Sequence, residues 1–219
     1  RQMLKHWPRN LPPNWKKSAE DATWKWLDSI VIKMGLCPWA IGVRKKGAIR
    51  CIATSAPDVE TLVNDADKEI TLLMEGLGPN PSSSVPETTL LISGAPINGD
   101  LQNSFLKEYR EYLLAAYEIQ GILDRRGLVG TLQLVPFHPQ AVHNLYKSGE
   151  LPDAADYAIR SPLPTFHLLR EKDILEAVQG SVSASKVPDI NRERLRRLGL
   201  DAAQAALARC CIGIPGRTA

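Results

Sequence analysis

The feature that most constrains the fold is a regular alternation of short apolar segments with longer segments of helical periodicity. Short segments rich in leucine and β-branched residues, most of them bounded by glycine or proline, predict strands at 48–54, 88–93, 130–136 and 165–170. Between and around them, apolar residues that recur every three or four positions predict helices at 18–34, 57–77, about 101–123, 172–179 and about 190–209. This order predicts a single-domain α/β sandwich, a mixed sheet of about four strands with helices packed on it.

The segment 57–77 carries the strongest helical pattern. Its apolar residues form one stripe, which we expect to be buried against the sheet: Val59, Leu62, Val63, Ala66, Ile70 and Leu73.

Charge divides the chain into a tail and a body. Residues 1–19 contain five basic residues and no acidic one, whereas the remaining residues have a net charge of −2. We therefore divide the chain into a basic extension rich in proline and tryptophan (1–22), an α/β domain (23–200) and a C-terminal helix end and tail (201–219). The extension has the residues of a partner-binding arm, namely Trp7, Arg9, Trp15, Lys16 and Lys17. It is equally compatible with a solvated tail at an arbitrary boundary.

Several classes of protein are disfavoured by composition. No apolar run is long enough to cross a bilayer, and a body of charge −2 is a poor partner for nucleic acid. Four cysteines are too few for a disulfide framework, which favours a reducing compartment. A basic leader without acids is typical of organellar targeting, so the plastid and the mitochondrion after leader cleavage are the compartments we consider.

Common catalytic signatures do not occur in the sequence. It contains no glycine-rich dinucleotide or P-loop motif, no zinc-protease motif and no nucleophile-elbow motif. No cofactor can be named on this basis, and enzymatic activity is left open.

Reactive side chains gather at the ends of predicted elements. Cys37 follows the first helix, His138 follows the third strand, and His167 lies in the fourth strand. If these three meet, they can hold a borderline metal with one open position, or a Cys37 thiolate can act as nucleophile. The alternatives are a buried apolar cysteine and histidines that satisfy local hydrogen bonds.

Two arginines flank the fourth strand. Arg160 and Arg170 can bind a carboxylate or a phosphate through their forked guanidinium groups, so we expect a small anion as a possible ligand of the same cleft. The alternative is structural pairing with Asp153, Asp156 or Glu171.

The same segments carry a resemblance to a known family. They are W-L-D-S-I-V-I-K-M-G-L-C-P-W-A (26–40), T-T-L-L-I (88–92), L-Q-L-V-P-F-H-P (132–139), R-S-P-L-P-T-F-H-L-L-R-E (160–171) and N-x-x-x-L-x-x-L-G (191–199). In this order they resemble the uncharacterised family DUF1415 over residues 23–200. The resemblance implies a compact α/β domain. It implies no particular reaction, because none is established for the family. Its recurring polar positions are Cys37, His138, Arg160, Ser161, His167, Arg170, Glu171 and Asn191.

The chain departs from that family pattern beside the arginine block, where Ile159 stands for a usual asparagine and Leu163 for a usual tyrosine. The terminal extensions and the polar residues of the core predict two alternative functions. The first is an accessory subunit of a larger organellar assembly, docked to other subunits through its terminal extensions. The second is an enzyme or anion-binding protein with a cleft of Cys37, His138, His167, Arg160 and Arg170, to which Ser161, Glu171 and Asn191 contribute.

Overall fold

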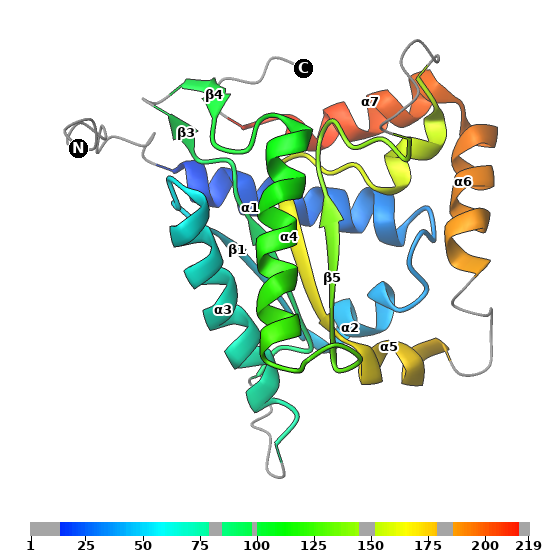
Figure 1. Cartoon of the computed structure of the whole chain (residues 1–219). Coiled ribbons are helices and arrows are strands. Elements are labelled where there is room, and N and C mark those ends of the chain that lie inside the picture. The colour runs from blue at the N-terminus through cyan, green and yellow to red at the C-terminus, as the bar shows by residue number, and fades with distance from the viewer. Residues whose placement is uncertain (1–13, 79–84, 98–99, 145–151, 179–185, 215–219) are drawn as a thin grey trace.

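The computed structural model describes residues 14–78, 85–97, 100–144, 152–178 and 186–214. Its centre is a four-stranded mixed sheet in the order β1-β2-β6-β5 (Figure 1). The strands are β1 (Ile49–Ala53), β2 (Thr88–Ile92), β5 (Leu132–Phe137) and β6 (Thr165–Arg170). β1 and β2 are parallel, while β6 is antiparallel to both β2 and β5. The predicted α/β fold with a mixed sheet of four strands is confirmed.

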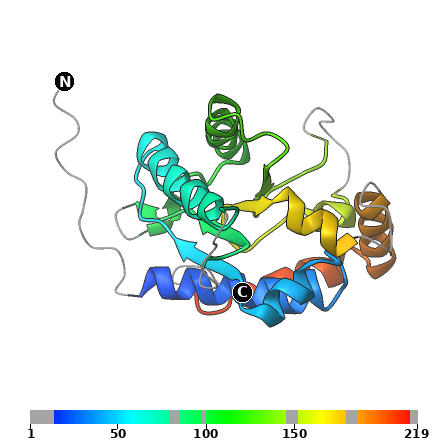
Figure 2. The same cartoon turned by 90° about the horizontal axis from the view of Figure 1, so that it is seen from below.

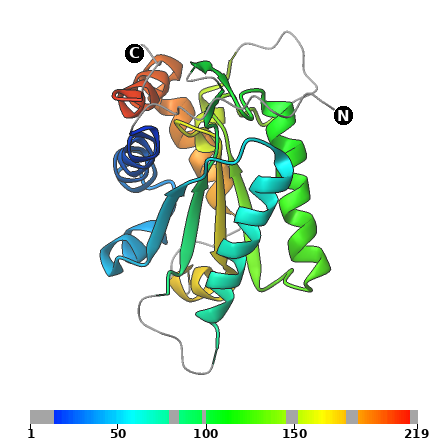
Figure 3. The same ribbon diagram turned by 90° about the vertical axis from the view of Figure 1, so that its left-hand side faces the viewer.

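Helices cover both faces of this sheet, as Figures 2 and 3 show. On one face lie α3 (Val59–Glu75) and α4 (Tyr109–Arg125). On the other lie α1 (Trp15–Trp26), its continuation as a π-helix, η1 (Leu27–Ile32), and α7 (Leu200–Cys211). The remaining helical segments are α2 (Ala40–Lys46), the 3₁₀ turn η2 (Ala154–Ala158), α5 (Glu171–Val178) and α6 (Val187–Leu198). In the described part of the chain, no helix is long and apolar enough to span a membrane.

Helix α3 forms where its pattern predicts. Asp58 caps its N-terminus, because the carboxylate accepts a hydrogen bond of 2.8 Å from the backbone N–H of Thr61. Along the stripe, Val59 and Val63 are partly buried. The other four residues are fully shielded from solvent: Leu62, Ala66, Ile70 and Leu73. They pack with α4 and the sheet in the largest apolar cluster of the protein. The predicted phase of this helix is therefore correct.

Two predicted helices have different bounds in the structure. The helix expected from about residue 101 begins at Tyr109, because Asp100–Ser104 instead forms β4, which pairs with β3 (Pro96–Ile97). The helix expected over 190–209 is two helices, α6 and α7, which meet at Gly199. Gly199 has φ 90° and ψ 153°, a conformation outside the helical region that is essentially restricted to glycine.

The predicted boundary of the N-terminal extension is wrong. Helix α1 begins at Trp15, whose side chain is 2% exposed and packs in one apolar cluster with Ile92, Leu163 and Ile214. Trp15 is thus a core residue of this chain, and its expected role as an anchor on a partner is wrong. Lys16 is exposed, and Lys17 forms an exposed ion pair with Asp21. Trp7 and Arg9 lie outside the described residues.

The predicted C-terminal boundary is also too early. Helix α7 lies almost entirely beyond residue 200, yet Ala203, Leu207 and Cys210 are buried in the cluster that contains Trp26. The domain therefore extends at least to Ile214, which is 3% exposed.

Candidate functional site

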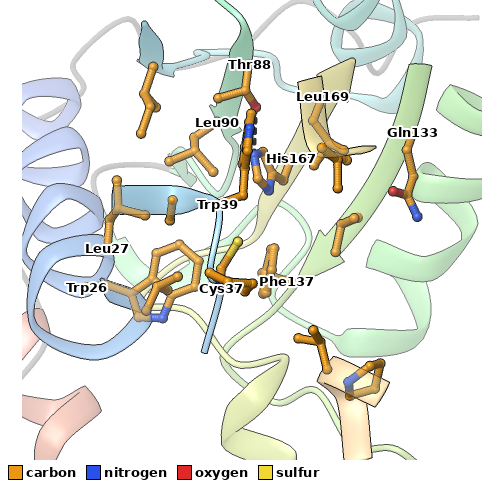
Figure 4. Close-up of a pocket in the computed structure, with 18 residues that line it drawn as sticks. Trp26, Leu27, Cys37, Trp39, Thr88, Leu90, Gln133, Phe137, His167 and Leu169 are labelled. Atoms are coloured by element: carbon orange, nitrogen blue, oxygen red, sulfur yellow. Dashed lines mark hydrogen bonds between the residues drawn. The ribbon is translucent and has the colours of Figure 1, made fainter. Parts of the chain in front are cut away.

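The face of the sheet that carries η1 and α2 contains a cavity of about 440 Å³ (Figure 4). This volume is within the usual range of small-molecule sites. Strands β2, β6 and β5 form one wall, and η1, the turn after it and the start of α6 form the others. The side chains around it are mostly apolar and include two tryptophans and a phenylalanine: Trp26, Leu27, Trp39, Leu90, Val135, Phe137, Leu169 and Pro188.

His167 is the principal polar group in this cavity. Strand register places it between Leu90 of β2 and Val135 of β5, with its side chain on the cavity face. The hydroxyl of Thr88 donates to the carbonyl oxygen of Leu168 at 2.6 Å and lies 2.7 Å from His167 Nε2. Because the single hydroxyl proton is already used, Nε2 carries a hydrogen and donates it to Thr88. The lone pair of the ring is therefore on Nδ1.

Burial keeps this imidazole neutral. It lowers the pKa of His167 from its ordinary 6.5 to about 4, because the charged form loses solvation on this apolar face. Trp39 and Phe137 lie beside the ring, with centroid distances of 6.5 and 6.2 Å. At neutral pH, His167 can accept a hydrogen bond but does not supply a positive charge.

Cys37 lines the same cavity from the turn that follows η1. Figure 4 shows its sulfur pointing toward the side of the cavity where Trp39 and His167 lie. Burial raises the pKa of its thiol above the ordinary value, although backbone hydrogen bonds from Ala40 and Trp39 act in the opposite direction. The thiol is therefore protonated at neutral pH, which is unfavourable for a nucleophile or a metal ligand.

Helix α6 holds this turn in place. Asn191 Nδ2 donates to the carbonyl of Leu36 at 2.6 Å, and an Arg194 N–H donates to the carbonyl of Met34 at 2.8 Å. Gly35 has φ 64°, and a Cβ there would lie 3.0 Å from the Arg194 guanidinium, so the turn requires glycine. Two side chains of α6 thus satisfy carbonyls at the end of η1. This contact gives a structural role to Asn191, the first residue of the 191–199 motif.

A second cavity of about 190 Å³ adjoins the first. Both are lined by Trp26, Val31, Cys37, Val135, Phe137, Val187 and Pro188. The smaller one adds His143, Tyr157 and Asn191. His143 Nδ1 lies 3.0 Å from Asp156 Oδ1, which also accepts the backbone N–H of His143 at 3.0 Å. The sequence analysis missed His143, and only its position five residues after His138 distinguishes it in the sequence.

His138 lies on the opposite face of the sheet from His167. Its ring stacks on Tyr109 of α4, with a centroid distance of 5.3 Å. Nδ1 accepts the backbone N–H of Gln140 at 3.1 Å, and Nε2 lies 3.0 Å from the carbonyl of Leu106. The expectation that His138 and His167 face one cleft is therefore wrong, because consecutive residues along β5 point to opposite faces and Phe137 occupies the face of His167.

The two arginines lie at opposite ends of β6 and do not share a cleft. Arg160 donates from Nε to the carbonyl of Ala141 at 2.9 Å, and its guanidinium lies over the ring of Tyr157. Arg170 is 7% exposed and is bonded to Asp173 at 2.5 Å. Neither lines the two cavities. Both arginines make structural contacts: Arg160 lies 3.8 Å from Asp156, one of the acids expected, whereas the partner of Arg170, Asp173, is not one of them.

The other predicted polar positions also make structural contacts. The Ser161 hydroxyl donates to the carbonyl of Leu163 at 2.6 Å, and the backbone N–H of Glu171 donates to the carbonyl of Thr131 at 2.9 Å. Among the described residues, no three His, Cys, Asp or Glu side chains lie close enough to hold a metal ion. Of the predicted cleft, the structure brings together only Cys37, His167 and Asn191.

The two cavities present a neutral, apolar environment with few polar groups. In the described part of their walls there is no lysine, arginine, aspartate or glutamate. Such a site is suited to binding an uncharged molecule with a large apolar surface, oriented by a small number of hydrogen bonds.

Comparison with known proteins gives a family without a described activity. A search of curated proteins and a search of solved structures both found no match. A family model described as a protein of unknown function matches residues 18–205, which is most of the chain. The matched region contains the sheet, both histidines of the cavities and the turn that presents Cys37. The chain therefore belongs to the family of proteins of unknown function DUF1415.

Proposed function

We propose that this protein binds a small, uncharged and largely apolar molecule in the larger cavity beside His167. The observation that carries the proposal is the Nδ1 lone pair of His167, which has no donor among the described residues, in a cavity with aromatic and aliphatic walls. Such a cavity removes apolar surface of a ligand from water, which supplies most of the binding energy, and one acceptor fixes its orientation. A protonated Cys37 and a neutral His167 support binding rather than nucleophilic catalysis.

The direct test is a fluorescence titration with N-phenyl-1-naphthylamine, an uncharged apolar probe that carries one N–H donor. Its emission should rise saturably with the wild-type protein. The substitution Val135→Trp should weaken binding at least about tenfold, because Val135 is half-buried on the cavity wall and a tryptophan there fills the space.

Val129→Trp is the matched control for this experiment. Val129 is 65% exposed and lines neither cavity, so the same chemical change should leave binding unaltered. Equal probe affinity in wild type and Val135→Trp, with both proteins folded, would show that the probe binds elsewhere and would refute the proposal. The sulfonated analogue 1-anilinonaphthalene-8-sulfonate should bind more weakly, since no cationic side chain lies among the described lining residues.

The accessory-subunit function stays a prediction, and its support is narrower than the sequence suggests. Trp15 and α7 pack in the core of this chain, so the elements left for docking to other subunits are residues 1–13 with Trp7 and Arg9, the exposed Lys16 and Lys17, and residues 215–219. An organellar compartment likewise depends on the basic composition of residues 1–13. Deleting residues 1–13 and measuring import into isolated organelles and co-purification with other subunits tests both points.

A further inference from the structure

The ligand's own hydrogen-bonding pattern can be deduced from the two cavities together. Each cavity is lined by side chains whose protonation or orientation is fixed by a hydrogen bond to a neighbouring protein group. In His167 this leaves the Nδ1 lone pair facing the larger cavity. The same reasoning applies to two residues of the smaller cavity, His143 and Asn191.

His143 is oriented by Asp156. The carboxylate of Asp156 accepts from the ring Nδ1, so in the neutral ring that nitrogen carries the hydrogen and the Nε2 lone pair is on the opposite edge. Asp156 is 7% exposed and also lies 3.8 Å from the Arg160 guanidinium. Among the described residues, Nε2 of His143 has no hydrogen-bond donor, and the ring lines the smaller cavity.

Asn191 is oriented in the same way by Leu36. A backbone carbonyl can only accept, so the Asn191 atom 2.6 Å from the Leu36 oxygen is the amide nitrogen. The amide oxygen is then the remaining polar atom. Asn191 is 9% exposed and lines the smaller cavity, and no donor to this oxygen is found in the described part of the protein.

Three hydrogen-bond acceptors therefore line the adjoining cavities without a donor among the described residues. His143 is exposed and His167 is half-buried, so water can reach these acceptors. A ligand that displaces water from the apolar walls has to carry donors in its place, because otherwise these hydrogen bonds are lost. We infer that the two cavities form one site for an elongated, uncharged, apolar molecule that carries a hydroxyl or N–H donor at each end. One donor meets Nδ1 of His167, and the other meets Nε2 of His143. This inference rests on the proposed function and extends it into the smaller cavity.

Straight-chain alcohols and diols test this pattern. We would measure the displacement of N-phenyl-1-naphthylamine by 1-decanol and 1,10-decanediol, with shorter and longer homologues to find the matching length. In a purely apolar cavity the second hydroxyl weakens binding, because it loses its hydrogen bonds to water. Here the best diol should bind about fivefold more tightly than the alcohol of equal length, the effect of one additional hydrogen bond.

Two substitutions test whether the tighter binding of the diol depends on the smaller cavity. In His143→Asn the amide nitrogen replaces Nδ1 and keeps the bond to Asp156, while the Nε2 acceptor is removed. In Ala158→Leu the larger side chain fills space in the smaller cavity, where Ala158 is half-buried. Both should abolish the advantage of the diol and leave the affinity for the alcohol unchanged.

The outcomes separate the two proposals. If the probe and the alcohols bind but no diol of any length binds more tightly than its alcohol, the two-ended ligand is refuted and the proposed function stands. If the diol advantage persists in both His143→Asn and Ala158→Leu, the second donor binds elsewhere and the inference is also refuted. If neither the probe nor the alcohols bind, the proposed function itself fails.

Discussion

At the scale of single residues, hydrogen bonds outside the cavities determine what the side chains present inside them. Thr88 fixes the tautomer of His167, Asp156 fixes that of His143, and the Leu36 carbonyl fixes the amide of Asn191. Each of these partners is a residue that the sequence gives no reason to select. The chemistry of the site is thus set as much by the supporting contacts as by the residues that line it.

The neutral state of His167 predicts a specific dependence of stability on pH. Its pKa is about 4 in the folded protein and 6.5 in the unfolded chain, so between these values the unfolded chain binds a proton that the native protein does not. Stability should fall as pH decreases through this window, by at most about 3 kcal/mol from this residue. His167→Gln keeps a donor toward Thr88 and removes the titration, so its stability should decrease less between pH 7.5 and 4.5.

Urea unfolding of both proteins at these two pH values is the measurement. Carboxyl groups such as Asp153, whose pKa is lowered by its hydrogen bond from Arg196, titrate in both proteins and cancel in the difference. Identical pH dependence of the wild type and the variant would contradict a depressed pKa at His167.

At the scale of elements, the backbone properties of proline and glycine decide where proline fits in the sheet and where helices end. Strand β5 contains Pro136, which is tolerated because β5 pairs only with β6 and lies at the edge of the sheet. Helix α2 ends at Gly47 with φ 67°, and α6 ends at Gly199 with φ 90°. The second of these ends turns the chain so that α7 packs beneath Trp26, instead of continuing as the single helix that the sequence predicts.

A pair of glycine substitutions tests this point. Gly199→Ala should destabilise the protein by about 1–3 kcal/mol, because alanine is strained at φ 90° and ψ 153°. Gly42→Ala makes the same chemical change inside α2 at an exposed position, where a Cβ meets no atom within 4 Å. It should stabilise the protein by about 0.5–1 kcal/mol through helix propensity. Thermal unfolding measures both, and equal effects of the two substitutions would contradict the role given to Gly199.

At the scale of the whole molecule, the first and last described segments complete the core. Trp15 from the first described helix and Ile214 from the last described turn meet in one cluster with Ile92 of the central strand β2. The larger cavity is likewise built from distant parts of the chain, since Leu27, Thr88, His167 and Pro188 all line it. The site is complete only when η1 and the start of α6 are both in place.

Substitution of Trp15 tests its place in the core. Trp15→Ala should lower the free energy of unfolding by about 3–5 kcal/mol, the usual loss for a buried aromatic residue. Trp15→Phe should cost less, because the buried indole N–H has no acceptor among the described residues. Lys16→Ala, at the exposed neighbouring position, is the control and should change stability by less than about 0.5 kcal/mol. A Trp15→Ala protein as stable as the control would restore the interpretation of Trp15 as part of a free arm.

The sequence by itself determined the elements whose signal is local. Strand β2 lies where a short continuous apolar run predicts it, and helix α3 lies where a period of 3.6 residues predicts it, because both signals can be read from neighbouring positions. It also selected Cys37, His167 and Asn191, which the structure brings to adjoining cavities. It did not identify His143, Thr88 or the burial of Trp15, since their partners lie far away in the chain.

Only the tertiary structure decided which reactive residues meet. His138 directly follows β5, which pairs with the strand that carries His167, yet the two side chains point to opposite faces, because the register sets Val135 opposite His167. A shift of one residue in that register would reverse the face of every side chain on β5. Register depends on the packing of both faces at once, with Phe166 toward α3 and α4 and His167 toward the cavity. Local periodicity does not contain this information, and the contacts between distant segments supply it.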